Sequence, residues 1–244
     1  ADSSILKTDF VINNGMDNVA PLEYGYWMCG GVQSPDGYAL ILPGSGGTEK
    51  FPYIRQLVMR DVSSGWLAAY ANSGDQGLAL TMPYNLLKEF YFWGDNIYQG
   101  TIEFKLGIYP IKAGEALRFS TAICPFSGIG VPDKVTELAA MSFGDPLNNP
   151  VLKFRFFQPG EYTLCLSGGF LIKDEVSFAE LKKIPLQKDF FAEVPYQLPA
   201  GKGTFVLKAE LQQNGRSVFF AETSCNQEVA TGIWNITPDC ERKP

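Results

Sequence analysis

The sequence predicts an all-β protein made of two β-sandwiches. Three observations support this fold class: apolar and polar residues alternate along several segments, short turn motifs separate these segments, and helical periodicity is scarce. Hydrophobic residues make up 45% of the 244 positions and aromatic residues 14%, which is ample apolar material for a packed core. Charged residues account for only 19%, so the composition leaves no room for a long disordered region.

The predicted strands follow from a repeat of two residues. In the segment 101–106, TIEFKL, the apolar side chains at even positions face one way and the polar ones at odd positions face the other. The segment 116–123, ALRFSTAI, repeats the pattern. The segments 204–211 and 217–222 flank Asn214-Gly215, a pair that favours a tight hairpin because both residues tolerate positive φ. The segments 153–157 and 162–166 are joined by QPGE, where Pro159 favours a turn.

Two short segments are predicted to be helical. The segment 177–184, SFAELKKI, begins with Ser177 and has Glu180 three residues later, the spacing of a capping box, and Pro185 is expected to end the helix. The segment 133–141, DKVTELAAM, is a weaker candidate. The chain is therefore expected to be all-β with one or two short helices.

A domain boundary is expected at residues 144–150, GDPLNNP, where prolines, asparagines and a glycine interrupt the periodicity. This divides the chain into residues 1–146 and 147–244. The second piece, with short strands and hairpin turns, has the size of an immunoglobulin-like sandwich.

Composition also excludes several classes of function. The net charge of −6 and the absence of Lys/Arg clusters argue against a nucleic-acid partner. No apolar run reaches the length of about 18–20 residues that spans a bilayer. No cofactor or metal is indicated, because the five cysteines lack CxxC spacing and the glycine-rich segment 43–55 lacks the P-loop spacing. With no histidine, Ser-His-Asp and Cys-His catalysis are excluded.

Cysteine positions add an expectation about packing. Cys124 and Cys165 lie within apolar strand patterns and are expected to be small core residues. Cys225 and Cys240 lie in a polar C-terminal stretch and are the better candidates for a disulfide, which the sequence does not settle. The aromatic-rich, charge-poor composition indicates an exported bacterial protein, in the periplasm or outside the cell.

Three motifs in the N-terminal piece resemble one known family. They are DFVINNGMDNVAPLEYGYW at 9–27, GWLAAYANSGDQGLALTMPYNLLKEFYFWGD at 65–95 and TIEFKLGIYPIKAGEALRFSTAI at 101–123. Together they resemble the second half of a galactose-mutarotase-like domain, the supersandwich of sugar epimerases and of accessory domains in polysaccharide-degrading enzymes. The likeness is greatest to uncharacterised bacterial relatives, and it implies a partial supersandwich followed by an Ig-like β-sandwich.

The resemblance also implies which residues would act. In the epimerases a glutamate serves as general base, and Glu103 matches its position; the position of the catalytic histidine is matched by Trp27. An indole N–H donates hydrogen bonds but does not give up its proton at physiological pH, so half of the catalytic pair is missing. The alternative for Glu103 is a cross-strand ion pair or a solvated side chain.

The resulting hypothesis is a non-catalytic carbohydrate-binding or accessory protein of a bacterial glycan-processing system. Its partner would be an oligosaccharide or polysaccharide, because aromatic faces stack on the apolar faces of sugar rings while charged groups bind the hydroxyls. Two alternatives remain open: a histidine-independent epimerase or polysaccharide lyase, and a structural sandwich that assembles into an oligomer without a ligand. The candidate ligand-binding residues are Tyr24, Tyr26, Trp27, Arg55, Trp66, Trp93 and Glu103.

Overall fold

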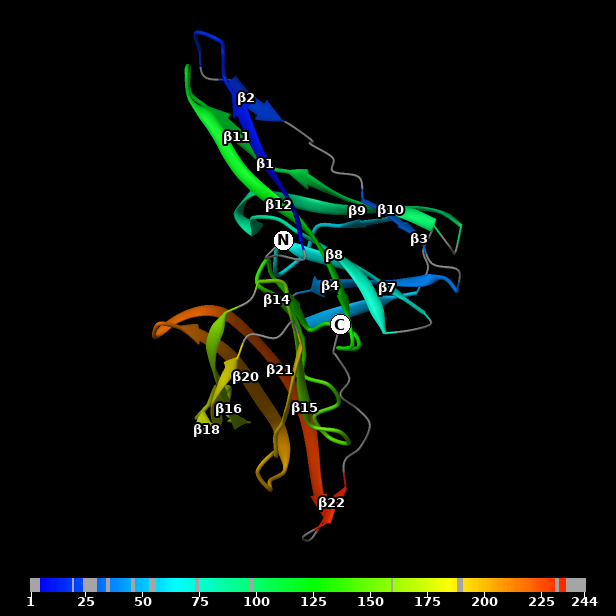
Figure 1. The fold of residues 1–244 in the computed structure, drawn as a ribbon, viewed down its shortest axis with the longest axis vertical. Helices are drawn as coiled ribbons and strands as arrows, with labels where there is room; N and C mark the ends of the chain where they lie inside the picture. Colours follow the sequence, from blue (N-terminus) through cyan, green and yellow to red (C-terminus); the bar gives the residue numbers. More distant parts are fainter. Residues whose placement is uncertain are drawn as a thin grey trace. The chain divides into compact units, whose positions relative to one another are not determined.

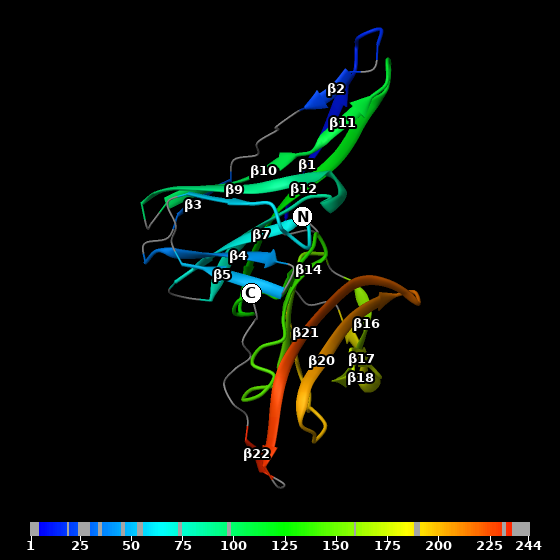
Figure 2. The same ribbon diagram turned by 180° about the vertical axis from the view of Figure 1, so that it is seen from behind.

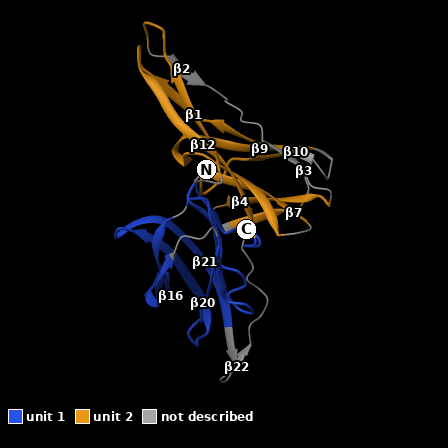
Figure 3. Ribbon diagram, viewed as in Figure 1, with its two compact units in different colours: residues 1–3, 128–243 blue, residues 4–127, 244 orange. Residues whose placement is uncertain are grey.

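The computed structural model confirms the all-β fold class. It describes residues 5–18, 20–23, 30–33, 36–44, 47–52, 56–72, 75–96, 99–158, 160–187, 191–230 and 233–235. These residues form antiparallel sheets with a single short 3-10 helix among them (Figure 1). The chain divides into two compact units, which we name in chain order: the first unit is residues 4–127 (orange, unit 2 in the key of Figure 3), and the second unit is residues 128–243 (blue, unit 1 in that key).

The first unit is a sandwich of two main sheets with a small third sheet. One main sheet has the order β1-β12-β8-β7-β4-β5, the other has the order β3-β10-β9-β6, and β11 pairs with β2. Figure 2 shows β9 and β10 as a layer separate from β4 and β7. The elements are β1 (Leu6–Asn13), β2 (Ala20–Glu23), β3 (Gly30–Gln33), β4 (Tyr38–Gly44), β5 (Gly47–Phe51), β6 (Gln56–Met59), β7 (Trp66–Ala71), β8 (Gln76–Thr81), the 3-10 helix η1 (Tyr84–Leu86), β9 (Leu87–Asn96), β10 (Gln99–Leu106), β11 (Ile108–Ile111) and β12 (Ala116–Ser127).

The core of the first unit lies between its two main sheets. The alternation predicted for 101–106 is confirmed, because Ile102, Phe104 and Leu106 of β10 are buried while the residues between them are half-buried. They pack in one cluster with Leu40 of β4 and Leu67 of β7, which belong to the other sheet. The open face of the β3-β10-β9-β6 sheet is therefore the one that carries the polar positions.

Asn14 fastens the turn after β1 to the segment that joins β11 and β12. Its buried side-chain Nδ2 donates hydrogen bonds to the carbonyl oxygens of Ile111, at 2.8 Å, and Asn18, at 2.9 Å. On the backbone, Asn14 N–H donates to the oxygen of Glu115 at 3.0 Å, and Gly114 N–H donates to the oxygen of Asn14 at 3.1 Å. These bonds join two turns that are about a hundred residues apart in the sequence.

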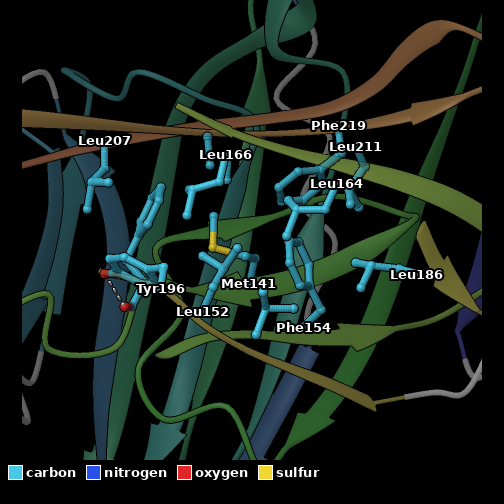
Figure 4. Close-up of a cluster of buried hydrophobic side chains, with 14 of the residues drawn as sticks. Met141, Leu152, Phe154, Leu164, Leu166, Leu186, Tyr196, Leu207, Leu211 and Phe219 are labelled. Atoms are coloured by element: carbon cyan, nitrogen blue, oxygen red, sulfur yellow. Dashed lines mark hydrogen bonds between the residues drawn. The ribbon is translucent and has the colours of Figure 1, made fainter. Parts of the chain in front are cut away.

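The second unit is a sandwich of sheets ordered β13-β14-β15-β19 and β17-β16-β20-β21-β22, with β18 also paired to β16. Figure 4 shows side chains from both sheets meeting in its core, with Tyr196 donating a hydrogen bond to the carbonyl oxygen of Phe143 at 3.1 Å. The strands are β13 (Lys134–Val135), β14 (Ala139–Ser142), β15 (Val151–Phe156), β16 (Glu161–Ile172), β17 (Glu175–Val176), β18 (Ala179–Gln187), β19 (Phe191–Pro195), β20 (Gly203–Gln213), β21 (Arg216–Ala230) and β22 (Ile233–Asn235).

The hairpin predicted at Asn214-Gly215 is confirmed. The two residues form the loop between β20 and β21, with φ of 52° and 74°, and Gln213 pairs with Arg216 on either side. Positive φ at both central residues is the requirement of the tight turn that matches the twist of paired strands.

The helix expected at 177–184 is wrong, because β18 passes through this segment and through Pro185. Proline is tolerated there since β18 pairs only with β16 among the described residues, and an edge strand has one row of N–H groups outside the ladder. The helix-like spacing of Leu181 and Ile184 arises from a bulge: Lys182 pairs with Leu166 and Glu180 pairs with Ser167, so Leu181 is the extra residue.

The helix expected at 133–141 is also wrong, because this segment is a tight hairpin between β13 and β14. Thr136 N–H donates to the oxygen of Ala139 at 2.9 Å, and the Thr136 hydroxyl accepts from Leu138 N–H at 3.1 Å. Threonine hydroxyls offer the backbone such local partners and so compete with helix formation.

The expected boundary at 144–150 falls inside the second unit, and the structure moves the division to residues 127 and 128. The proline- and asparagine-rich segment is the turn between β14 and β15, which pair with each other. Asp145 shapes this turn by accepting hydrogen bonds from the backbone N–H of Leu147 and from both the backbone and side chain of Asn148. The composition of residues 144–150 therefore marks a turn within a hairpin and not a boundary between domains.

The cysteine expectations have mixed outcomes. Cys124 is buried, as expected. Cys165 lies on the opposite face of β16 from the buried Leu164 and Leu166 and is only half-buried, so its expected place in the core is wrong. Cys225 is buried in the second core, and Cys240 lies outside the described residues.

Candidate functional site

The open face of the β3-β10-β9-β6 sheet carries a row-by-row arrangement of aromatic and polar side chains. In the first row, Trp93 of β9 pairs with Thr101 of β10 on one side and with Gln56 of β6 on the other. In the second row, Tyr91 pairs in the same way with Glu103 and Val58. Residues directly opposite each other in antiparallel strands point to the same face. We call this set the platform: Gln56, Val58, Tyr91, Trp93, Thr101 and Glu103.

The platform faces outward because its neighbours in sequence are anchored in the core. Phe90 and Phe92 alternate with Tyr91 and Trp93 along β9 and are both buried. Leu57, between Gln56 and Val58, packs against the same cluster. With a side-chain period of two, burying one set of residues fixes the other set on the open side.

Aromatic and apolar surface is accessible on the platform. Trp93 is 41% exposed, and Val58 beside Tyr91 is also exposed. Large aromatic side chains are usually buried in sandwich cores, whereas Trp93 keeps a large part of its surface open on this sheet face.

A carboxylate stands next to this aromatic surface. The Thr101 hydroxyl donates a hydrogen bond to Glu103 Oε1 at 2.9 Å, which holds one carboxylate oxygen in place. Glu103 is half-buried and lies on the strand adjacent to Tyr91 and Trp93. The platform therefore combines a stacking surface with an oriented hydrogen-bond acceptor.

A third, charged row follows on the same face. Arg60 Nε donates to Glu89 Oε2 at 2.7 Å, and Lys105 pairs in register with Glu89. The Glu89 side chain is 7% exposed and the Arg60 side chain 75% exposed. The carboxylate is thus almost completely buried, whereas the guanidinium reaches into solvent.

The structure brings two of the predicted site residues together and places a third in the core. Trp93 and Glu103 lie on adjacent strands of one open face, one row apart. Trp66 is 1% exposed in β7 of the other sheet, so it is a core residue and has no surface to offer a ligand. Tyr24, Tyr26, Trp27 and Arg55 lie outside the described residues, and their roles stay predictions.

Sequence reasoning did not select Gln56, Val58 or Thr101 as binding residues. The alternation in QLVM, residues 56–59, marks a strand with Gln56 and Val58 on one face, and Arg60 follows the end of this strand. That signal places them on a surface, but only the pairing of β6 with β9 puts them beside Trp93.

Two glutamates lie on the described part of this face. Glu103 belongs to the platform, and Glu89 accepts a hydrogen bond from Arg60. Within the described ranges no three His, Cys, Asp or Glu side chains gather as a metal site would require. No helix in the described part of the chain has the length and apolarity to cross a membrane.

Comparisons with known proteins give a distant structural likeness. No protein-family model matches the sequence, and no curated protein matches it. Among solved structures, the chain is similar to a polysaccharide lyase, with a TM-score of 0.36 and 14% sequence identity over 91% of this chain. The match spans 32% of the lyase, so this chain corresponds to about a third of that protein's length. A likeness of this size supports no argument about substrate or chemistry.

Proposed function

We propose that the first unit binds an oligosaccharide or polysaccharide on the platform, without converting it. The observation that supports this is the open tryptophan, Trp93, one row from the oriented carboxylate of Glu103. An aromatic ring offers a large apolar area with little conformational freedom to lose, and it suits the apolar face of a sugar ring. A carboxylate oxygen beside it accepts hydrogen bonds from the sugar hydroxyls.

The proposal includes the setting of the protein. We regard the chain as a mutarotase-like unit followed by an Ig-like unit, exported to the periplasm or the cell exterior, and acting as an accessory in glycan processing. The two-sandwich architecture and the aromatic-rich, charge-poor composition support this setting.

Trp93→Ala tests the binding proposal. Its affinity for a glycan found by array screening is expected to fall about tenfold, which corresponds to about 1.4 kcal/mol. Phe220→Ala is the matched control, because Phe220 is an exposed aromatic residue on the second unit, outside the platform, and its loss should leave affinity unchanged. Equal affinity of wild type and Trp93→Ala would overturn the proposal.

Two further measurements separate the alternatives. Sugar isomerisation by the wild type that Glu103→Gln abolishes would establish an epimerase instead of a binding protein. A concentration-dependent dimer in sedimentation equilibrium, lost in Trp93→Ala, would establish an assembly surface, since an exposed apolar face also serves that role.

A further inference from the structure

The charged row extends the platform beyond what a neutral sugar needs. Glu89 and Lys105 lie two residues from Tyr91 and Glu103 along β9 and β10, and Arg60, the residue after the end of β6, forms an ion pair with Glu89. From Trp93 to Glu89 is four residues of β9, a distance of about 13 Å at the usual rise of a strand. A ligand that reaches from the tryptophan to this row is an oligosaccharide and not a single sugar.

Arg60 is held in a manner that suits capture of an anion. Glu89 accepts from Nε, and among the described residues this is the bond that fixes the guanidinium. The guanidinium also has an edge formed by its two Nη groups, and the side chain is 75% exposed. A guanidinium presents parallel N–H groups that match a carboxylate in a bidentate manner. Because Glu89 orients the group in advance, less conformational freedom is lost when an anion binds.

The ion pair satisfies the buried carboxylate of Glu89, which would be costly to leave without a partner. It engages Nε of Arg60, while the guanidinium as a whole stays exposed. The local charge of the row, two cations and one carboxylate, is positive even though the whole chain carries −6. The end of the platform that Arg60 occupies therefore carries a local positive charge.

We propose that the ligand of the platform is an acidic glycan, in which a uronic acid carboxylate binds the Nη edge of Arg60 while a neighbouring sugar stacks on Trp93. This inference rests on the proposed function and adds the class of glycan to it. The aromatic rows supply affinity for sugar rings in general, and the charged row supplies preference for acidic ones.

The test compares two probes that differ only at the carboxylate. Oligogalacturonate and the same oligosaccharide after carboxyl reduction are titrated into wild type, Arg60→Gln, Arg60→Lys and Trp93→Ala by calorimetry. We expect wild type to prefer the acidic probe about tenfold, an energy of about 1.4 kcal/mol, typical of a charge-assisted hydrogen bond. Arg60→Gln should lose this preference and keep its affinity for the reduced probe, and Arg60→Lys should lose most of it because the fork is gone.

Controls distinguish the two proposals from each other and from misfolding. Lys112→Gln is the matched control, because Lys112 has the same 75% exposed fraction in the same unit and lies off the platform, so it should behave as wild type. Retained affinity for the reduced probe shows that Arg60→Gln is folded. Equal affinity of wild type for both probes, or no binding of the acidic probe, overturns the acidic-glycan inference. An unchanged affinity in Trp93→Ala overturns the proposed function itself.

Discussion

Replacing Gly114 by alanine tests how the fold holds the turn between β11 and β12. Gly114 has φ of 73° in a β-turn closed by a hydrogen bond from Glu115 N–H to the oxygen of Lys112 at 3.0 Å. This φ is favourable for glycine and unfavourable for a residue with a Cβ atom. Gly15, which lies in the turn fastened to this one by Asn14, does not have a positive φ.

The expected change in the free energy of unfolding depends on backbone conformation alone, because neither substitution changes the packing. A Cβ atom built on either Gly114 or Gly15 has nothing within 4 Å. At Gly114 the left-handed conformation costs alanine about 1–2 kcal/mol. At both positions alanine also restricts the unfolded chain, which stabilises the fold by about 0.4–1 kcal/mol. Gly15→Ala should therefore be stabilising, and Gly114→Ala should be less stable than Gly15→Ala by about 1–2 kcal/mol.

Urea denaturation followed by tryptophan fluorescence measures this difference. Three of the four tryptophans lie in residues 4–127, and Trp66 is a buried reporter within this unit. The midpoint is expected to shift in opposite directions for the two variants at equal m-value. Equal midpoints, or a lower midpoint for Gly15→Ala, would refute the explanation of the turn by backbone conformation.

Three further predictions concern stability. Asn14→Ala should lower the free energy of unfolding by about 2 kcal/mol in urea denaturation, because it leaves the carbonyl oxygen of Ile111 without its buried donor. Partial burial raises the pKa of Asp145, but hydrogen bonds from the side chain and backbone of Asn148 and from a neighbouring amide outweigh it and hold the pKa below the ordinary 3.8. The contribution of Asp145 is therefore complete above pH 3.8 and is lost as pH falls through the lowered pKa, so the stability difference between wild type and Asp145→Asn should shrink in acid denaturation series below that pH. Phe104→Ala should lower the unfolding free energy by about 3–5 kcal/mol in urea, because this fully buried ring leaves a cavity between the two sheets.

The strands were predictable where one face is buried and the other is open. The alternation at 101–106 matches β10, and Asn214-Gly215 marks the hairpin between β20 and β21. Both signals depend on residues that are neighbours in the sequence. The segment 177–184 was not predictable in the same way. Its Ser177, Glu180 and Pro185 fit the pattern of a capped helix. This segment instead forms most of β18, which pairs with β16 along its length, and this pairing with another strand outweighs the local preference for a helix.

The amino-acid sequence by itself determined the all-β class, the faces of the clearest strands and the place of Glu103 on the polar face of its strand, since each follows from a local period of two. Only the tertiary structure decided that Trp66 belongs to a core, that Trp93 and Glu103 share an open face, and that Arg60 lies at one end of that face. The physical reason is that strand order and register are set by contacts between segments far apart in the chain, and no local pattern records which strands become neighbours.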